Sequence, residues 1–160
     1  GGADVEVVVI VPPWGLIPEV AQLLQDQWRD VGIRAVLDPV PSRTTLFERI
    51  STGDFNLVAY YEFGQDASLL NQFFLSSGAS NWTGYASSDL DTALLGALAE
   101  TNPDVRRQYY AQAQRIIMNQ ALILPIRDYV NLNGVRTSVQ NLAYDAFGWF
   151  PLLPNVTVSE

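Results

Sequence analysis

Residues 5–40 read VEVVVIVPPWGLIPEVAQLLQDQWRDVGIRAVLDPV, and this stretch decides the fold class. Val5–Val11 is almost entirely β-branched, which predicts a strand, and a Pro-Pro pair ends it. Apolar residues then recur at helical spacing until Gly32, a residue typical of helix ends. Ile33–Val40 follows as a second apolar strand. The order strand, helix, strand predicts a βαβ unit with two parallel strands, of which Val5–Val11 is the central one.

The rest of the chain continues this α/β pattern. Phe55–Tyr61 is a nearly all-apolar run and predicts a third buried strand. Short strands are also expected over Leu122–Ile126 and Tyr129–Val135, and residues 138–160 are expected to be an irregular tail. We therefore predict one α/β domain over residues 1–160, with a mixed, largely parallel sheet flanked by helices. Helix starts are predicted at Thr45, Ser68, Ser87 or Ser88, and Asn102.

The composition excludes several function classes. The chain is 48% hydrophobic and 16% charged, which is typical of a globular protein and not of a disordered one. Its formal net charge is −8 and it has no Lys, so nucleic acids and anionic membranes are unfavourable partners. It contains neither Cys nor His, which removes disulfides, thiol nucleophiles, Cys/His zinc sites and His-based acid–base catalysis. No metal or other cofactor is expected.

The first candidate binding residues follow the third predicted strand. Tyr61, Glu62, Phe63 and Asp66 lie where an apolar run stops at two carboxylates and a glycine. Ligands of open α/β sheets bind beyond the carboxyl ends of the strands, so this edge is a candidate site. If the strand alternates, Tyr61 and Phe63 share one face and Glu62 points to the other. Asp66 either binds a cationic ligand group or is a turn residue that bonds its own backbone.

Two further groups of aromatic residues are candidates. Trp82 and Tyr85 belong to the loop sequence NWTGY, and loops carry binding rings more often than helix faces do. Trp82 serves equally well as a cover for the edge of the core. Trp14 follows the first strand and lines the same sheet edge, or else caps the following helix as a hydrophobic residue.

Catalytic signatures are absent from the sequence. It has no G-x-S-x-G motif, no Gly-rich phosphate loop and no dinucleotide-binding fingerprint. Glu62 and Asp66 resemble a glycosidase carboxylate pair in composition only, because the distance between the two carboxyl groups decides that chemistry. A protein-interaction module that docks a partner on its aromatic edge is the other alternative.

Four segments together resemble one family, the peptide- and nickel-type solute-binding proteins of bacterial ABC transporters. Their order and spacing over roughly residues 5–129 carry the resemblance. The segments are AQLLQDQWRDVGIRAVL (21–37), TGDFNLVAYY (52–61), NWTGY (81–85) followed by Asp89-Leu90-Asp91, and RRQYYAQAQRIIMNQALILPI (106–126).

The resemblance implies a type II periplasmic-binding-protein-like fold, in which two lobes close on a ligand. The match corresponds to the carboxy-terminal lobe alone, so the chain is expected to be part of a longer exported protein, periplasmic or extracellular and membrane-anchored. Its expected partners are a peptide or similar small solute, the amino-terminal lobe and the membrane permease.

The resemblance also assigns residue roles. Asp66 falls on the family Asp that pairs with the amino terminus of a peptide, while Phe63, Trp82 and Tyr85 are expected to line apolar walls. Two positions depart from the family pattern. Phe63 stands where an aromatic residue, often Trp, precedes the Asp, and Ala67-Ser68 stand where a Pro usually follows it. The second departure changes the expected path of the loop.

Overall fold

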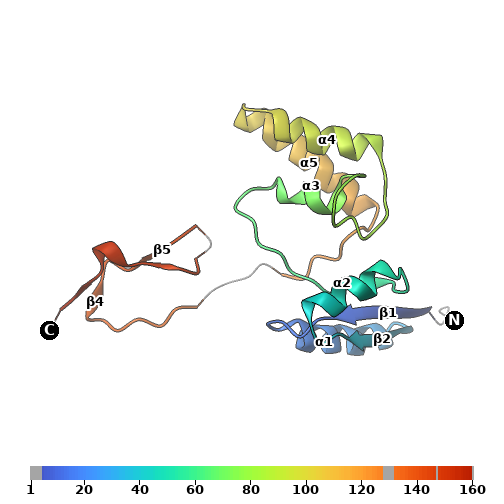
Figure 1. The fold of residues 1–160 in the computed structure, drawn as a ribbon, viewed down its shortest axis with the longest axis horizontal. Helices are drawn as coiled ribbons and strands as arrows, with labels where there is room; N and C mark the ends of the chain where they lie inside the picture. Colours follow the sequence, from blue (N-terminus) through green and yellow to red (C-terminus); the bar gives the residue numbers. More distant parts are fainter. Residues whose placement is uncertain (1–4, 128–131, 147, 160) are drawn as a thin grey trace. The chain divides into compact units, whose positions relative to one another are not determined.

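The computed structural model describes residues 5–127, 132–146 and 148–159. The chain divides into two compact units, residues 1–62 and 63–160. The elements of both units are labelled in Figure 1. That the two units together form a single lobe remains a prediction.

Unit 1 is built on a three-stranded parallel sheet with strand order β2-β1-β3. It confirms the predicted βαβ unit and the central position of the first strand. The seven residues of β1 pair in register with those of β2, from Val5 opposite Ile33 to Val11 opposite Pro39. Its elements are β1 (Val5–Val11), α1 (Ile17–Arg29), β2 (Ile33–Pro39), α2 (Arg43–Ser51) and β3 (Leu57–Val58).

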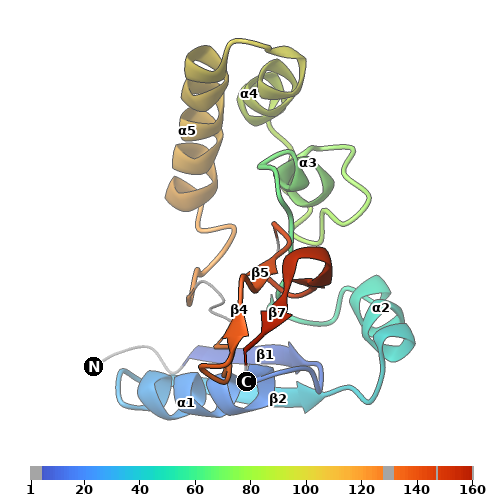
Figure 2. The same cartoon turned by 90° about the vertical axis from the view of Figure 1, so that its left-hand side faces the viewer.

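Helices cover both faces of β1, which explains its continuous apolar sequence. Val9 and Val11 pack with Ala21 of α1, and Figure 2 shows α1 lying along β1 and β2. Ile10 points to the opposite face and packs with Leu46 of α2. This division follows from the alternation of side chains along a strand.

The third strand is much shorter than the predicted Phe55–Tyr61. Only Leu57–Val58 forms a ladder with β1, although the amide of Ala59 still donates to the Ile10 carbonyl at 2.9 Å. The Asn56 side chain replaces part of the ladder at one end, because its Oδ1 accepts from the Val8 amide at 2.8 Å. At the other end, Tyr60 packs beside the core cluster formed by Ile10 and Leu46.

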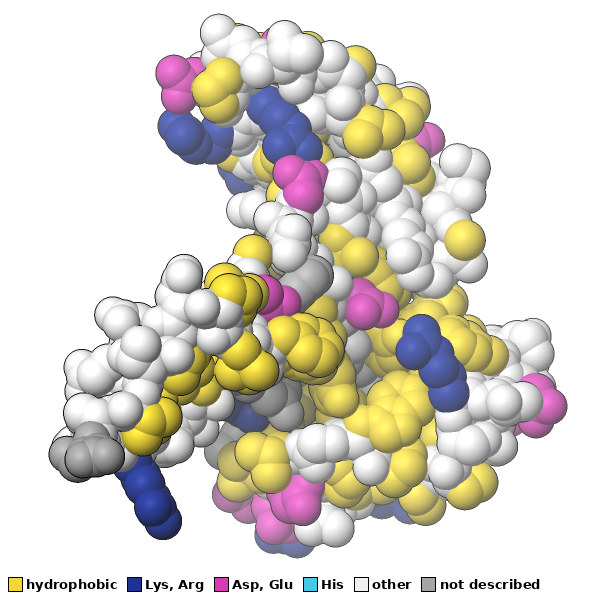
Figure 3. All heavy atoms as spheres, turned by 60° about the vertical axis from the view of Figure 1, so that its left-hand side comes forward, with side chains coloured by type: hydrophobic (Ala, Val, Ile, Leu, Met, Phe, Trp, Pro, Cys, Tyr) yellow, Lys and Arg dark blue, Asp and Glu magenta, His cyan; other side chains and the backbone are white. Residues whose placement is uncertain are grey.

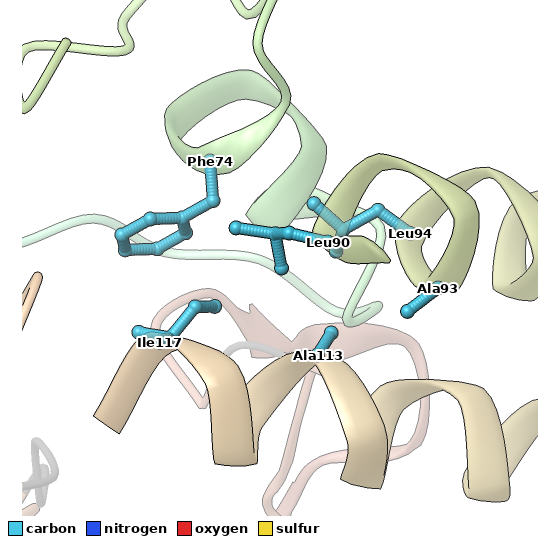
Figure 4. Close-up of a cluster of buried hydrophobic side chains, with 6 residues drawn as sticks. All are labelled: Phe74, Leu90, Ala93, Leu94, Ala113 and Ile117. Carbon is cyan, nitrogen blue, oxygen red and sulfur yellow. The ribbon is translucent and has the colours of Figure 1, made fainter. Parts of the chain in front are cut away.

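The described part of unit 2 contains three α-helices, α3 (Leu69–Phe74), α4 (Ser88–Ala99) and α5 (Pro103–Asn119). Their shared core consists of the six side chains drawn in Figure 4, which come from all three helices. Buried residues of α4 recur at helical spacing, as an amphipathic face requires. The six residues of the core shared by the three helices are Phe74, Leu90, Ala93, Leu94, Ala113 and Ile117.

The predicted start signals of α4 and α5 are confirmed. The Ser87 side chain accepts from the amide of Leu90 at 3.4 Å. The Asn102 side chain accepts from the amides of Asp104 and Val105 at 3.0 and 3.3 Å. Each cap satisfies amide groups that have no partner within the first helical turn.

The predicted strand over Leu122–Ile126 is wrong, because the structure places no strand there. Ile123, Leu124 and Ile126 are each about half exposed, so this apolar run does not pack into a sheet formed by the described residues. Of the predicted strand Tyr129–Val135, residues 129–131 lie outside the described residues, and residues 132–135 contain no strand.

Residues 138–160, expected to be an irregular tail, contain two short antiparallel strand pairs. A turn joins one of these pairs, in which Asp145 Oδ1 accepts from the amides of Trp149 and Phe150 at 2.9 and 3.2 Å. Such turns depend on side-chain bonds that leave no hydrophobic period in the sequence. The elements are β4 (Val139–Gln140) with β7 (Thr157–Val158), β5 (Ala143–Tyr144) with β6 (Pro151–Leu152), and a 3-10 turn over Leu153–Asn155.

The surface carries no concentrated positive charge on the side shown in Figure 3. Arg side chains lie there in separate small groups among hydrophobic and uncharged ones. Within the described residues, no helix combines the length and hydropathy that a bilayer span requires.

Candidate functional site

The carboxyl edge of the unit 1 sheet holds a group that we call the sheet-edge cluster: Trp14, Tyr60 and Glu62. The rings of Trp14 and Tyr60 meet edge to face, with 6.2 Å between centroids. The Tyr60 hydroxyl donates to Glu62 Oε2 at 3.3 Å. Because β1 and β3 are parallel, the residues that follow them emerge at the same edge of the sheet. Two predicted site residues, Trp14 and Glu62, are thus associated with a common neighbour.

Tyr60 was not among the predicted site residues, which included Tyr61 instead. The signal was present in the sequence, since Tyr60 and Glu62 are two residues apart and share a face of an extended chain. Burial raises the pKa of the Tyr60 hydroxyl, and the nearby Glu62 carboxylate raises it further. Tyr60 therefore keeps its proton at neutral pH and can donate a hydrogen bond to the carboxylate.

Asp66 belongs to unit 2, where Arg106 of α5 binds both of its carboxylate oxygens. Arg106 Nη2 donates to Oδ1 at 2.7 Å and Nη1 donates to Oδ2 at 2.8 Å. The Ser68 amide also donates to Asp66 Oδ1 at 2.8 Å. The hydrogen bonds from Arg106, and then that from Ser68, hold the pKa of the Asp66 carboxyl well below its usual range. Asp66 is therefore charged and has its own cationic partner.

Arg106 is itself fixed by contacts beyond Asp66. Its Nε donates to the carbonyl of Ala97 at 3.0 Å, near the end of α4. Its guanidinium also lies 5.1 Å from the centre of the Tyr110 ring and donates to the Tyr110 hydroxyl at 3.2 Å. Arg106 thus ties three parts of unit 2 together: the loop before α3, the end of α4, and α5.

Trp82 and Tyr85 pack against the helical core of unit 2. Trp82 meets Phe73 edge to face, with 5.6 Å between ring centroids. Tyr85 packs against the core cluster that contains Phe74 and Leu90. Both rings are half-buried, so these contacts favour the alternative in which the loop covers the edge of the core.

Asn81 organises this loop. Its Nδ2 donates to the carbonyls of Leu75 and Tyr85 at 3.0 and 2.9 Å, and its Oδ1 accepts from the Thr83 hydroxyl at 2.8 Å. The side chain thus replaces a network of backbone bonds in a segment that has no regular structure.

We expect Asn81→Ala to lower the free energy of unfolding by about 2 kcal/mol, because two carbonyls lose their donor. Urea denaturation followed by circular dichroism measures the change. Asn119→Ala is the matched control, since Asn119 is exposed at the end of α5 and its loss should cost less than about 0.5 kcal/mol. Equal unfolding midpoints for the two variants would show that the Asn81 network is not stabilising.

The remaining predicted residues are Phe63 and Tyr61. Phe63 meets Trp149 edge to face, with 4.4 Å between ring centroids. Trp149 was not predicted, because it lies 86 positions further along the chain (149 − 63) and nothing in the local pattern connects the two. Tyr61 is half-buried at the end of unit 1.

Among the described residues, no group of three or more Asp or Glu side chains is close enough to hold a metal ion.

Sequence comparison finds relatives among the peptide-binding proteins, although no family model matches. The peptide transport periplasmic protein SapA of Salmonella typhimurium is 26% identical over 144 residues, which covers 84% of this chain. The periplasmic oligopeptide-binding protein OppA of Haemophilus influenzae is 32% identical over 74 residues, or 46% of this chain. These alignments cover only 26% and 14% of the two relatives, so the chain spans about a quarter of their length or less.

Structure comparison finds the same kind of protein. HbpA2 from Haemophilus parasuis matches 97% of this chain with a TM-score of 0.79 and 20% identity, over 32% of its own length. A dipeptide-binding protein from a Pseudoalteromonas species, solved with Met-Leu, matches 99% of this chain with a TM-score of 0.69 and 20% identity, over 33% of its length. A nickel ABC transporter protein from Bacillus halodurans matches 76% of this chain with a TM-score of 0.65 and 21% identity, over 26% of its length.

The structural neighbours confirm the predicted fold class, an α/β fold of the type II periplasmic-binding-protein kind. The sequence relatives and the structural neighbours also agree with the resemblance found in the sequence. The chain is thus similar in sequence to part of the peptide-binding and peptide-transport proteins OppA and SapA, and it shares its fold with part of solved peptide- and nickel-type ABC transporter proteins.

Proposed function

We propose that this chain is the carboxy-terminal lobe of an exported solute-binding protein and forms one wall of its ligand cleft. The ligand is a peptide or a similar small solute that is delivered to an ABC importer. The observation that carries this proposal is the similarity to SapA, a peptide transport periplasmic protein, over 84% of the chain. The membrane permease and a second lobe are the partners that this role requires.

The chemistry of the sheet-edge cluster supports a binding role. Trp14 and Tyr60 offer aromatic surface, and Glu62 offers a negative charge, at the edge where α/β sheets bind ligands. Rings and a carboxylate together suit a ligand with an apolar body and a cationic group. Binding of this kind needs no reactive group and no cofactor.

The arrangement around Asp66 argues against a glycosidase in which Asp66 is the acid. A glycosidase acid needs a carboxyl group whose pKa is raised, so that it carries a proton near neutral pH. The Arg106 guanidinium holds the pKa of Asp66 below its usual range instead. The names of the two relatives also describe an oligopeptide-binding protein and a peptide transport protein. We therefore expect no glycoside hydrolysis by the wild type.

The 160-residue chain should bind di- to penta-peptides about a hundredfold or more weakly than the full-length protein that contains it. Closure of two lobes removes water from a ligand, whereas one lobe leaves half of the ligand surface exposed. Isothermal calorimetry with the same peptides, applied to both proteins, measures the difference. Micromolar affinity in the isolated chain would contradict the half-site model, and a full-length protein that binds no peptide would refute the proposed ligand class.

A further inference from the structure

We infer that Asn133-Gly134 is a site of spontaneous covalent modification, at which the asparagine deamidates to aspartate and isoaspartate. The pair lies in the segment between α5 and β4, and its reaction is independent of the proposed function. The sequence supplies the reacting atoms, and the fold decides whether these atoms can meet.

The reacting groups are the side-chain amide of Asn133 and the main-chain amide of Gly134. Of the asparagines in the chain, Asn133 alone is followed by glycine. Asparagine is among the thermolabile residues of proteins. A following glycine favours the reaction, because it has no Cβ to block the approach and reaches main-chain conformations that other residues avoid.

The reaction needs only water and hydroxide as partners. The Gly134 nitrogen loses its proton to hydroxide and attacks Cγ of Asn133. A bond forms between the two atoms, the Cγ–Nδ2 bond breaks, and ammonia leaves with a proton from water, which closes a succinimide ring. Water then opens the ring at either carbonyl. Cleavage of the new bond gives aspartate, and cleavage of the original peptide bond gives isoaspartate, whose main chain runs through Cγ.

The structure leaves both groups accessible for this reaction. Residues 132–136 form no helix or strand, and Asn133 and Gly134 are both exposed. A Cβ atom placed on Gly134 would meet no atom within 4 Å, so the space beside the attacking nitrogen is open. No hydrogen bond joins the pair to the described residues of the chain. Such a segment samples the conformations needed for ring closure without unfolding the helical core.

Other asparagines lack one of these conditions. Asn102 precedes Pro103, whose nitrogen has no proton to lose. Asn119 is exposed, as Asn133 is, but the amide that follows it belongs to Gln120 and donates to the carbonyl of Ile116 at 3.0 Å. Asn119 is therefore the matched control within the same chain.

The modification changes the charge and the local main chain but not the fold. Each conversion replaces a neutral amide by a carboxylate and so adds one negative charge to a formal net charge of −8. The additional methylene of isoaspartate falls where the chain forms no ladder, so no strand pair loses its register. The aged protein should keep the circular dichroism signal of its helices.

Incubation of the 160-residue chain at mildly alkaline pH, in native buffer and in concentrated guanidinium chloride, tests the inference. Peptide mapping by mass spectrometry measures aspartate and isoaspartate at each asparagine, and methylation by an isoaspartyl methyltransferase measures isoaspartate independently. In native buffer, Asn133 should convert at least about tenfold faster than Asn119. Gly134→Ala should slow the reaction about tenfold, whereas Val135→Ala, at a half-exposed position beside the pair, should not change it.

Four results would overturn the inference. These are equal rates at Asn133 and Asn119, an undiminished rate in Gly134→Ala, aspartate formed without isoaspartate, and conversion in native buffer more than about tenfold slower than in denaturant. The last result would show that the fold holds the pair in an unreactive conformation. None of these measurements uses a ligand, so the proposed function stands or fails separately.

Discussion

Leu94→Ala is expected to lower the free energy of unfolding by about 3 kcal/mol, the cost typical of a leucine truncated inside a well-packed core. Leu94 is fully buried, with 0% of its surface exposed, and belongs to the cluster that joins α3, α4 and α5. Truncation removes apolar contacts and leaves a cavity that neighbouring helices fill only in part. Figure 4 shows Leu94 among Leu90 and the facing side chains of α5.

The control for this prediction lies on the same helix. Leu98 is 57% exposed, so Leu98→Ala removes the same atoms from a position that contributes little to the core. Its effect should stay within about 0.5 kcal/mol. Urea denaturation followed by the helical circular dichroism signal measures both variants. Similar midpoints for the two would mean that the α3–α4–α5 core does not form as described.

Gly78→Ala is expected to destabilise the chain by about 3 kcal/mol, through steric overlap with backbone atoms that cannot move aside. A Cβ atom at this position would lie 2.6 Å from the Gln72 carbonyl oxygen and 2.8 Å from that of Asn71. These carbonyls belong to α3, and the Gly78 amide itself donates to the Leu75 carbonyl at 2.8 Å. Only glycine lets the chain approach the end of this helix so closely.

Gly134→Ala is the matched control, because an added Cβ there meets no atom within 4 Å. Its unfolding midpoint should equal that of the wild type or lie slightly above it, since alanine reduces the freedom of the unfolded chain. Thermal denaturation of both variants checks the pair. A stable Gly78→Ala variant would show that the loop after α3 can take another path.

Local sequence was sufficient where one short segment carries the whole signal. The βαβ unit was predicted because a β-branched run, a helical period and a second strand follow one another within residues 5–40. The caps of α4 and α5 were predicted for the same reason, since Ser87 and Asn102 bond amides only two or three residues away. Such features need no knowledge of distant residues.

The candidate site also has one part that local sequence predicts and another part that depends on packing. The position of Trp14 and Glu62 after parallel strands was readable from the sequence, and the sheet-edge cluster contains both. The alternation of the strand also points to Tyr60 as the neighbour of Glu62, although the predicted site contained Tyr61. The contacts of Trp82 and Phe63 were not readable, because their ring partners are set by how the helices and the tail pack.

By itself, the sequence determined the fold class and the order of the elements in unit 1. Tertiary structure alone decided the environment of Asp66. Its partner Arg106 lies 40 positions away, on a helix whose place depends on the core of Phe74, Leu94 and Ile117. A charge acts through the distance to its nearest counter-charge, and that distance is a property of packing, which a local sequence pattern does not contain.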